Sequence, residues 1–181
     1  MTWEEHVIYT VGRVNKILWQ LTRFKQLGAS NDQLLKYYLL KIRSILMFGA
    51  VCYHSALTLQ QRYQLELQQK RSLAIILGTN YRSYKQARIT LNLPSLEDLR
   101  EQACSKWAIK ASSGPQHCHL FPKNTSIVNT RGRQVYLEVK CKSAKYFNSA
   151  VPSMIRNLNR QVSGSTDSVT LTTKSGIVFV V

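Results

Sequence analysis

Four short capping signals constrain the fold of this chain more than any other feature of its sequence. In each signal, a Ser or Thr is followed three residues later by an acidic residue or a glutamine. The four pairs are Thr2 with Glu5, Ser30 with Gln33, Thr58 with Gln61, and Ser95 with Asp98. In such a capping box, the hydroxyl accepts a hydrogen bond from a free backbone N–H of the first helical turn, and the second side chain bonds back to the cap. The chain is therefore expected to be mainly all-α.

Apolar residues recur at helical spacing after these signals, and the breaks between the runs predict a bundle of about five helices. The expected helices cover residues 2–28, 30 to about 52, 58–77, 83–91 and 95–111. Gly28 and Gly78 end the first and third of them, because glycine tolerates the left-handed backbone of a helix C-cap. The second helix is apolar on most sides and is expected to be the central buried helix.

Each of the three longest amphipathic runs has an expected buried face. The faces are Val7, Val11, Val14, Leu18 and Leu21 in the first helix, Leu59, Tyr63, Leu67, Leu73 and Ile76 in the third, and Leu96, Leu99, Ala103, Trp107 and Ile109 in the fifth. These steps of mostly three and four residues place the side chains on one side of a helix.

The pattern changes at Ser112-Ser-Gly-Pro115, after which the chain becomes polar and irregular. Weak alternation predicts a short strand from Gln134 to Val139, and a last short helix is expected from Tyr146 to Gln161. Residues 169–173 and 177–181 flank Lys174-Ser-Gly176 with the spacing of a β-hairpin. The expected organisation is a helical domain over 1–112, a basic connector with a short terminal helix over 113–161, and a tail over 162–181.

The charge balance points to a polyanionic partner. The chain has 25 Lys and Arg against 9 Asp and Glu, a formal net charge of +16. The excess is spread along the chain, with 16 basic and 7 acidic residues in 1–113 and 9 basic and 2 acidic residues in 114–181. Nucleic acid is the usual partner of such a chain, and an anionic membrane is less common.

No apolar run approaches the roughly 20 residues that span a bilayer, and no secretory signal opens the chain. Its four cysteines match no compact disulfide framework, so they are expected to be reduced thiols. An intracellular location is therefore expected, with nucleus and cytoplasm both open.

Eleven basic residues are the candidates for contact with nucleic acid. They lie mainly away from the apolar stripes or among aromatic residues, and they are Arg13, Lys16, Arg23, Lys25, Lys70, Arg71, Arg82, Lys85, Arg88, Arg131 and Arg133. Cationic groups bind phosphates, and interleaved aromatic rings can stack on bases. A solvated surface charge explains any one of these residues adequately, whereas the set favours polyanion contact.

Recognisable catalytic chemistry is missing from the sequence. No glycine-rich phosphate loop is present, and Asp32, Asp98 and Asp167 are widely separated, whereas two-metal phosphoryl transfer needs converging carboxylates. An enzyme of unrecognised type, with zinc held by Cys104, His117, Cys118, His119 and Cys141, is an alternative. That set lacks the two close ligand pairs of most zinc sites, so no cofactor is expected.

Several stretches, taken in order, resemble one family. They are Trp3-Glu-Glu-His6, Val14-Asn-Lys-Ile-Leu-Trp-Gln-Leu21, Leu34-Leu-Lys-Tyr-Tyr38, Phe48-Gly-Ala-Val-Cys-Tyr-His54, Tyr84-Lys-Gln-Ala87, Leu93-Pro-Ser-Leu96, Cys104-Ser-Lys-Trp107, and Phe147-Asn-Ser-Ala-Val-Pro152 with Arg156-Asn-Leu-Asn159. This order resembles the region that follows the catalytic domain in reverse transcriptases of LINE-type (non-LTR) retrotransposons, over about residues 1–160.

The resemblance implies a thumb and C-terminal connector rather than the polymerase itself. The catalytic Asp pair of the family's palm has no counterpart in this chain, so the chain is expected not to be an enzyme. Arg13, Lys16, Arg23 and Lys25, with Lys70 and Arg71, would then contact the backbone of an RNA–DNA hybrid or other duplex. The alternative is a structural relic with no independent function, which needs the absent polymerase domain to fold properly and is prone to self-association.

Overall fold

The computed structural model describes residues 3–125 and 135–163, and every regular element within these ranges is helical. In chain order, the helices are α1 (Glu4–Gln26), α2 (Asn31–Tyr37), a π-helical turn (Tyr38–Ile42), α3 (Arg43–Met47), α4 (Ala50–Tyr53), α5 (Leu59–Leu77), α6 (Tyr84–Thr90), α7 (Leu96–Ser113), α8 (Ala144–Phe147) and α9 (Ala150–Ser163). Short 3₁₀ turns lie at His54–Ala56, Gly78–Asn80 and Cys118–Leu120. The all-α expectation is confirmed, and the expected β-hairpin lies outside the described residues.

Three of the four capping boxes are present with both hydrogen bonds. The backbone N–H groups of Gln33, Gln61 and Asp98 donate to the cap hydroxyls of Ser30, Thr58 and Ser95 over 3.3, 3.2 and 3.0 Å. The return bonds from the cap N–H groups are 2.9, 3.0 and 3.3 Å long. The fourth expected cap, Thr2, lies outside the described residues, and the residue before α1 is Trp3, whose side chain makes no capping bond.

Gly28 ends α1 as expected. Its φ of +87° is left-handed, its N–H donates to the carbonyl of Lys25, and the N–H of Ala29 donates to the carbonyl of Phe24. This pair of bonds is a Schellman motif, which satisfies carbonyls that the end of a helix otherwise leaves free. The chain therefore reverses sharply and leads directly into α2.

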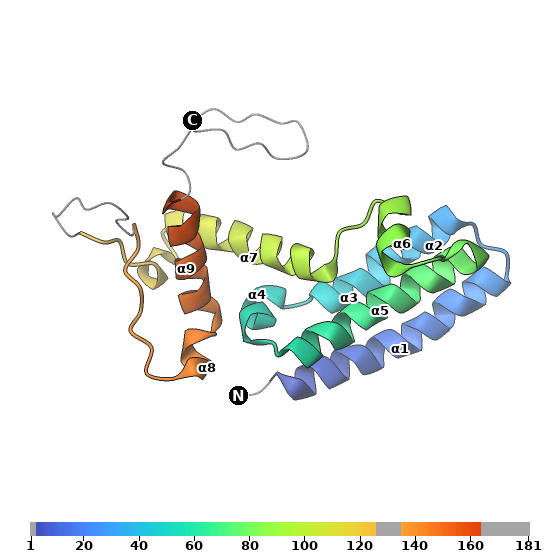
Figure 1. The fold of residues 1–181 in the computed structure, drawn as a ribbon, viewed down its shortest axis with the longest axis horizontal. Coiled ribbons are helices and arrows are strands. Elements are labelled where there is room, and N and C mark those ends of the chain that lie inside the picture. Colours follow the sequence, from blue (N-terminus) through green and yellow to red (C-terminus); the bar gives the residue numbers. More distant parts are fainter. Residues whose placement is uncertain (1–2, 126–134, 164–181) are drawn as a thin grey trace, which may run out of the picture.

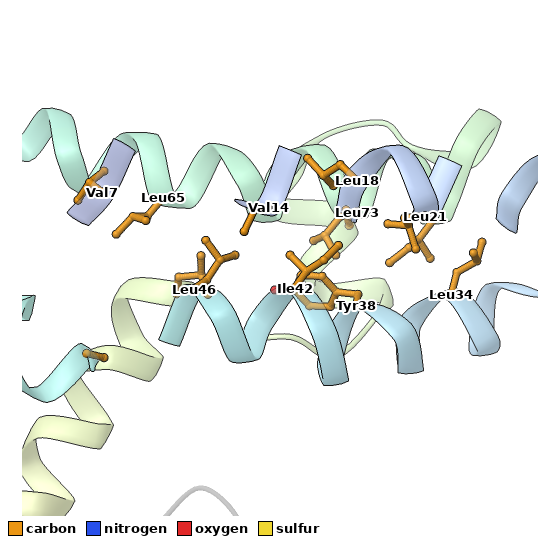
Figure 2. Close-up of a cluster of buried hydrophobic side chains, with 14 of the residues drawn as sticks. Val7, Val14, Leu18, Leu21, Leu34, Tyr38, Ile42, Leu46, Leu65 and Leu73 are labelled. Carbon is orange, nitrogen blue, oxygen red and sulfur yellow. The ribbon is translucent and has the colours of Figure 1, made fainter. Parts of the chain in front are cut away.

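Helix α1, helix α5 and the α2–α3 segment form three rods that lie side by side (Figure 1), and the main core lies between them. Figure 2 shows Val7 of α1 near Leu65 of α5 at one end and Leu21 of α1 near Leu34 of α2 at the other, so α1 and α5 run in parallel and the α2–α3 segment runs antiparallel to both. The buried positions of α1 are Val7, Thr10, Val14, Leu18 and Leu21, which match the expected face except at Thr10 and the half-buried Val11. Each fully buried Leu or Val contributes about 1.5–3 kcal/mol.

The expectation that the second helix is buried on most sides is wrong. It buries Leu34, Tyr38, Ile42 and Leu46, while Leu40 and Phe48 are 73% and 75% exposed on its outer side. These buried residues are four positions apart. In a regular α-helix each step of four residues turns the side chain by about 40°, so the buried stripe would rotate away from the core. The π-helical turn adds one residue to a turn and offsets most of this drift. The helix then ends at Phe48 instead of continuing to Cys52, since Gly49 takes a left-handed φ of +68°.

The expected stripe of the third helix is also partly wrong. Leu59 and Tyr63 of α5 are exposed, and the buried positions are Leu65, Gln68, Gln69, Ser72, Leu73, Ile76 and Leu77. Gln69 is tolerated in the core because it accepts from the Tyr38 hydroxyl over 2.8 Å and donates to the Pro94 carbonyl over 2.9 Å. Gln69 and Ser72 thus complete the stripe because they bond Tyr38 and backbone carbonyls.

Helix α7 connects the main core to a second, smaller one. Its first turns bury Leu96 against the main core, whereas Cys104, Ala108 and Ala111 pack with Phe121 and with Met154, Ile155 and Leu158 of α9. The Ile109 side chain, expected in the buried face, is exposed instead. The last helix is divided at Asn148 and Ser149 into α8 and α9, in place of one helix from Tyr146 to Gln161.

The strand expected from Gln134 to Val139 does not form in the described part of this segment. Its described residues make one antiparallel bridge, between Tyr136 and Lys123, and Gln134 lies outside the described ranges. The amide side chain of Asn159 covers the edge of this segment that faces away from Lys123. It accepts from the Tyr136 N–H over 3.0 Å and donates to the Tyr136 carbonyl over 2.9 Å, so it occupies the groups that another strand would need.

Candidate nucleic-acid interface

The outer face of α1 carries two pairs in which an arginine lies over an aromatic ring one turn earlier. The Arg13 guanidinium carbon is 5.7 Å from the centre of the Tyr9 ring, and that of Arg23 is 5.5 Å from the Trp19 ring. Tyr9 and Trp19 are 64% and 63% exposed. Residues four apart share a helix face, so each pair presents a ring and a cation to solvent together. Lys16 is exposed on the same helix, between the two pairs.

Helix α5 extends this positive face because it lies parallel to α1. Arg71 of α5 is exposed and borders a groove of about 410 Å³ between the two helices. Lys70 is also exposed, but it lies four residues after Glu66 and therefore shares the side of α5 that Glu66 occupies. Ile8, Val11, Gly12 and Asn15 of α1 and Gln64, Leu67 and Gln68 of α5 form the rest of its lining. The structure thus brings four sequence candidates, Arg13, Lys16, Arg23 and Arg71, onto the neighbouring sides of two adjacent helices.

The positive charge of this face is not offset by acidic side chains on it. The acidic residues of α1 and α5, both described in full, are Glu4 and Glu5 in the first turn of α1 and Glu66 of α5. Glu66 accepts from the Tyr84 hydroxyl of α6 and from the Leu96 N–H of α7, so it is engaged away from α1. Burial and the bond to Glu66 raise the pKa of Tyr84, which keeps this hydroxyl protonated. The face is therefore electropositive along its length.

Lys25 makes two hydrogen bonds that the sequence did not indicate. Its Nζ donates to Asn31 Oδ1 over 2.7 Å and to the Ile76 carbonyl over 2.9 Å. These two bonds join the end of α1 to the first residue of α2 and the last turn of α5. A cation at the C-terminal end of a helix also interacts favourably with the helix dipole.

The three candidates of the α6 segment lie elsewhere. Helix α6 packs on α5 on the side away from α1 (Figure 1). Arg82 and Lys85 are exposed there, whereas Arg88 is half-buried with its guanidinium carbon 5.5 Å from the centre of the Tyr84 ring. These residues therefore form a second basic surface. Arg131 and Arg133 lie outside the described residues.

The zinc candidates do not gather in the structure. Cys104 is buried against the α9 cluster, whereas His117, Cys118 and His119 are exposed in and beside a 3₁₀ turn. Within residues 3–125 and 135–163, no group of three or more His, Cys, Asp or Glu side chains is placed to hold a metal ion. The same ranges contain no helix that is both long and apolar enough to cross a membrane.

Sequence reasoning missed the aromatic partners and the groove. The Tyr9–Arg13 and Trp19–Arg23 spacings are a readable signal, because an aromatic residue four positions before an arginine shares its helix face. The groove had no such signal, since it depends on which faces of α1 and α5 meet. Comparison with protein-family models, curated proteins and solved structures finds no match to this chain.

Proposed function

We propose that this chain is a non-catalytic, nucleic-acid-contacting fragment of a LINE-type reverse transcriptase, equivalent to its thumb and connector. In this role, the outer face of α1 and α5 binds the phosphate backbone of an RNA–DNA hybrid or other duplex. Phosphate contacts of this kind give affinity with little sequence preference.

One observation carries the proposal. Arg13, Lys16, Arg23 and Arg71 lie on two parallel helices, and none of them forms an ion pair within the described part of the chain. Cations held beside carboxylates contribute little to polyanion binding, whereas free cations release counterions from the nucleic acid when they bind. The resemblance to the post-catalytic region of the family supports the same assignment.

The test is fluorescence anisotropy of a labelled RNA–DNA hybrid at several salt concentrations, with light scattering on the same sample. Each lost phosphate contact lowers the slope of log affinity against log salt by about 0.9. We expect the double variant Lys16→Gln, Arg71→Gln to lower the slope by about 2. The matched control is Lys41→Gln, Lys106→Gln, which removes the same charge from exposed positions on the π-helical turn and α7.

The location of the interface is tested separately from its existence. If Arg82→Gln with Lys85→Gln lowers the slope and the α1/α5 variant does not, the interface lies on α6 and the proposed face is wrong. Absence of binding by the unmodified chain at low salt contradicts the proposed function as a whole.

The exposed side chains of Leu40 and Phe48 favour a second candidate, a structural fragment without independent function. Both lie on the outer side of the α2–α3 segment and are more than 70% exposed. Large exposed apolar side chains mark surfaces that another domain covers or that self-associate. In a reverse transcriptase fragment, the missing polymerase domain is the natural cover.

A further inference from the structure

The groove between α1 and α5 has a volume typical of a small-molecule site and is open to solvent along one side. Its volume is about 410 Å³, within the range of about 300–1,000 Å³ that is common for ligand pockets. Gly12 lies along it, and a Cβ added there would meet no atom within 4 Å. The missing side chain therefore leaves open space between two helices that are in close contact below, at Val7, Val14 and Leu65 (Figure 2).

A buried acceptor without a partner lies along the groove. Gln68 is 2% exposed, and its Nε2 donates to the Gln64 carbonyl over 3.5 Å. Its Oε1 is buried and has no hydrogen-bond partner among the described residues. Buried polar atoms in proteins are nearly always bonded, so this acceptor in the wall of the groove would gain a partner if the Gln68 side chain turned toward a donor bound there.

The other residues of the groove restrict the chemistry of that ligand. Ile8 and Leu67 offer apolar contact, and Asn15 and Gln64 carry amides that can bond the edge of a flat, polar ring. Arg71 lines the groove, and the exposed Lys16 lies one turn after Gly12 on α1. A ligand that fits this lining is a flat ring that carries N–H donors and is attached to a polyanion. A nucleobase within a nucleic-acid strand meets each of these requirements.

We infer that the groove between α1 and α5 receives one unpaired base of a bound nucleic-acid strand. The base lies over Gly12 and donates an N–H to Gln68 Oε1, while the flanking phosphates contact Arg71 and its neighbouring cations. This inference rests on the proposed function, because the same face supplies the phosphate contacts. It adds the prediction that single strands and single-stranded overhangs bind more tightly than phosphate contacts alone can explain.

The experiment compares three labelled ligands by anisotropy: a twelve-nucleotide oligodeoxycytidine, an abasic strand of the same length, and a blunt duplex. Cytosine has an exocyclic amine to donate, and the abasic strand carries the same phosphates without bases. We expect the oligodeoxycytidine to bind about tenfold more tightly than the abasic strand, since contacts to one base are typically worth that factor or more.

Two substitutions at one position then test the groove itself. Gly12→Leu fills it, whereas Gly12→Ala adds a single methyl group and is the matched control. Both variants add helix propensity at a site with open space, so both are expected to fold. Gly12→Leu should abolish the tenfold preference and leave the salt slope and duplex binding unchanged, while Gly12→Ala should retain the preference.

The outcomes separate this inference from the proposed function. Equal binding of the natural and abasic strands, or a preference that survives Gly12→Leu, overturns the base site while the phosphate interface stands. Displacement of the oligodeoxycytidine by submillimolar cytidine monophosphate would assign the groove to a free nucleotide and would also overturn the inference. Failure of all three ligands to bind at low salt overturns the proposed function.

Discussion

At the scale of single residues, the first turns of α7 bury a guanidinium group that has no hydrogen-bond partner among the described residues. Arg100 is fully buried, and its three guanidinium nitrogens have no hydrogen-bond partner among the described residues. Burial lowers the pKa of Arg100, while Tyr53, Glu66 and Glu97 oppose that shift. The neighbouring His54 is half-buried, and desolvation, then Arg100 and Arg62, lower its pKa to about 4, against a smaller raising effect of Glu97. His54 is therefore neutral in the folded chain at pH 7.

The depressed pKa of His54 predicts a loss of stability in mild acid. The unfolded chain binds a proton at about pH 6.5 and the folded chain does so at about 4, so between these values the unfolded state holds more protons. The free energy of unfolding should fall by about 2 kcal/mol from this group between pH 7 and 4.5. Urea melts of the chain and of His54→Gln at both pH values measure it. An equal loss of stability in both proteins would show that His54 is not responsible.

Lys25 and Lys16 should respond differently to the same substitution, although both are lysines of α1. Lys25→Ala removes the two bonds to Asn31 and the Ile76 carbonyl and should cost about 1–2 kcal/mol of unfolding free energy, with the salt slope of nucleic-acid binding unchanged. Lys16→Ala should leave stability within about 0.5 kcal/mol and lower the slope. If Lys25→Ala lowers the salt slope and leaves the unfolding free energy unchanged, Lys25 is a phosphate contact.

At the scale of elements, α1 shows how backbone conformation decides what a glycine does. Gly12 lies in regular helix with open space at its Cβ, whereas Gly28 has a φ of +87° in the Schellman motif that reverses the chain. The first glycine costs the helix stability, because it adds freedom to the unfolded chain. The second contributes stability, because other residues adopt that conformation only with strain.

Alanine should therefore act with opposite signs at the two positions. Gly12→Ala is expected to raise the free energy of unfolding by about 0.5–1 kcal/mol. Gly28→Ala is expected to lower it by about 1 kcal/mol, since the left-handed conformation strains a side chain. Paired urea melts give both values. A stabilising Gly28→Ala would mean that α1 ends by a different turn in solution.

At the scale of the whole molecule, the chain combines a well-filled core with an exposed apolar surface. The α1, α2–α3 and α5 rods share one cluster of buried side chains, and α7 joins it to the smaller cluster beneath α9. Leu40 and Phe48 lie outside both clusters and are exposed. The high positive charge opposes association at low salt, because the charges of two chains repel one another.

Self-association should therefore appear as salt rises and charge repulsion is screened. Light scattering should show a larger mean mass at high salt for the unmodified chain, and Leu40→Lys with Phe48→Ser should suppress the increase. The matched control is Leu27→Lys, an exposed leucine at the other end of the bundle. Equal masses for all three proteins at high salt would remove this surface as the cause.

The sequence by itself determined the parts of this protein that depend on neighbouring residues. Ser30, Thr58 and Ser95 begin helices in the structure as they do in the pattern, because a capping bond spans only three residues. Gly28 ends α1 for an equally local reason. The fold class and most helix boundaries followed from such signals.

The tertiary structure decided everything that depends on which faces meet. It placed Gln69 in the core and Tyr63 in solvent, because Tyr38 and Pro94 offer Gln69 bonding partners that no local pattern shows. It placed Lys25 where its ammonium group bonds across helices. It also formed the groove at Gly12, because α1 and α5 pack in parallel. The hydrogen bonds among these features join residues 25 to 51 positions apart in the chain, and their energies exist only once the helices have packed.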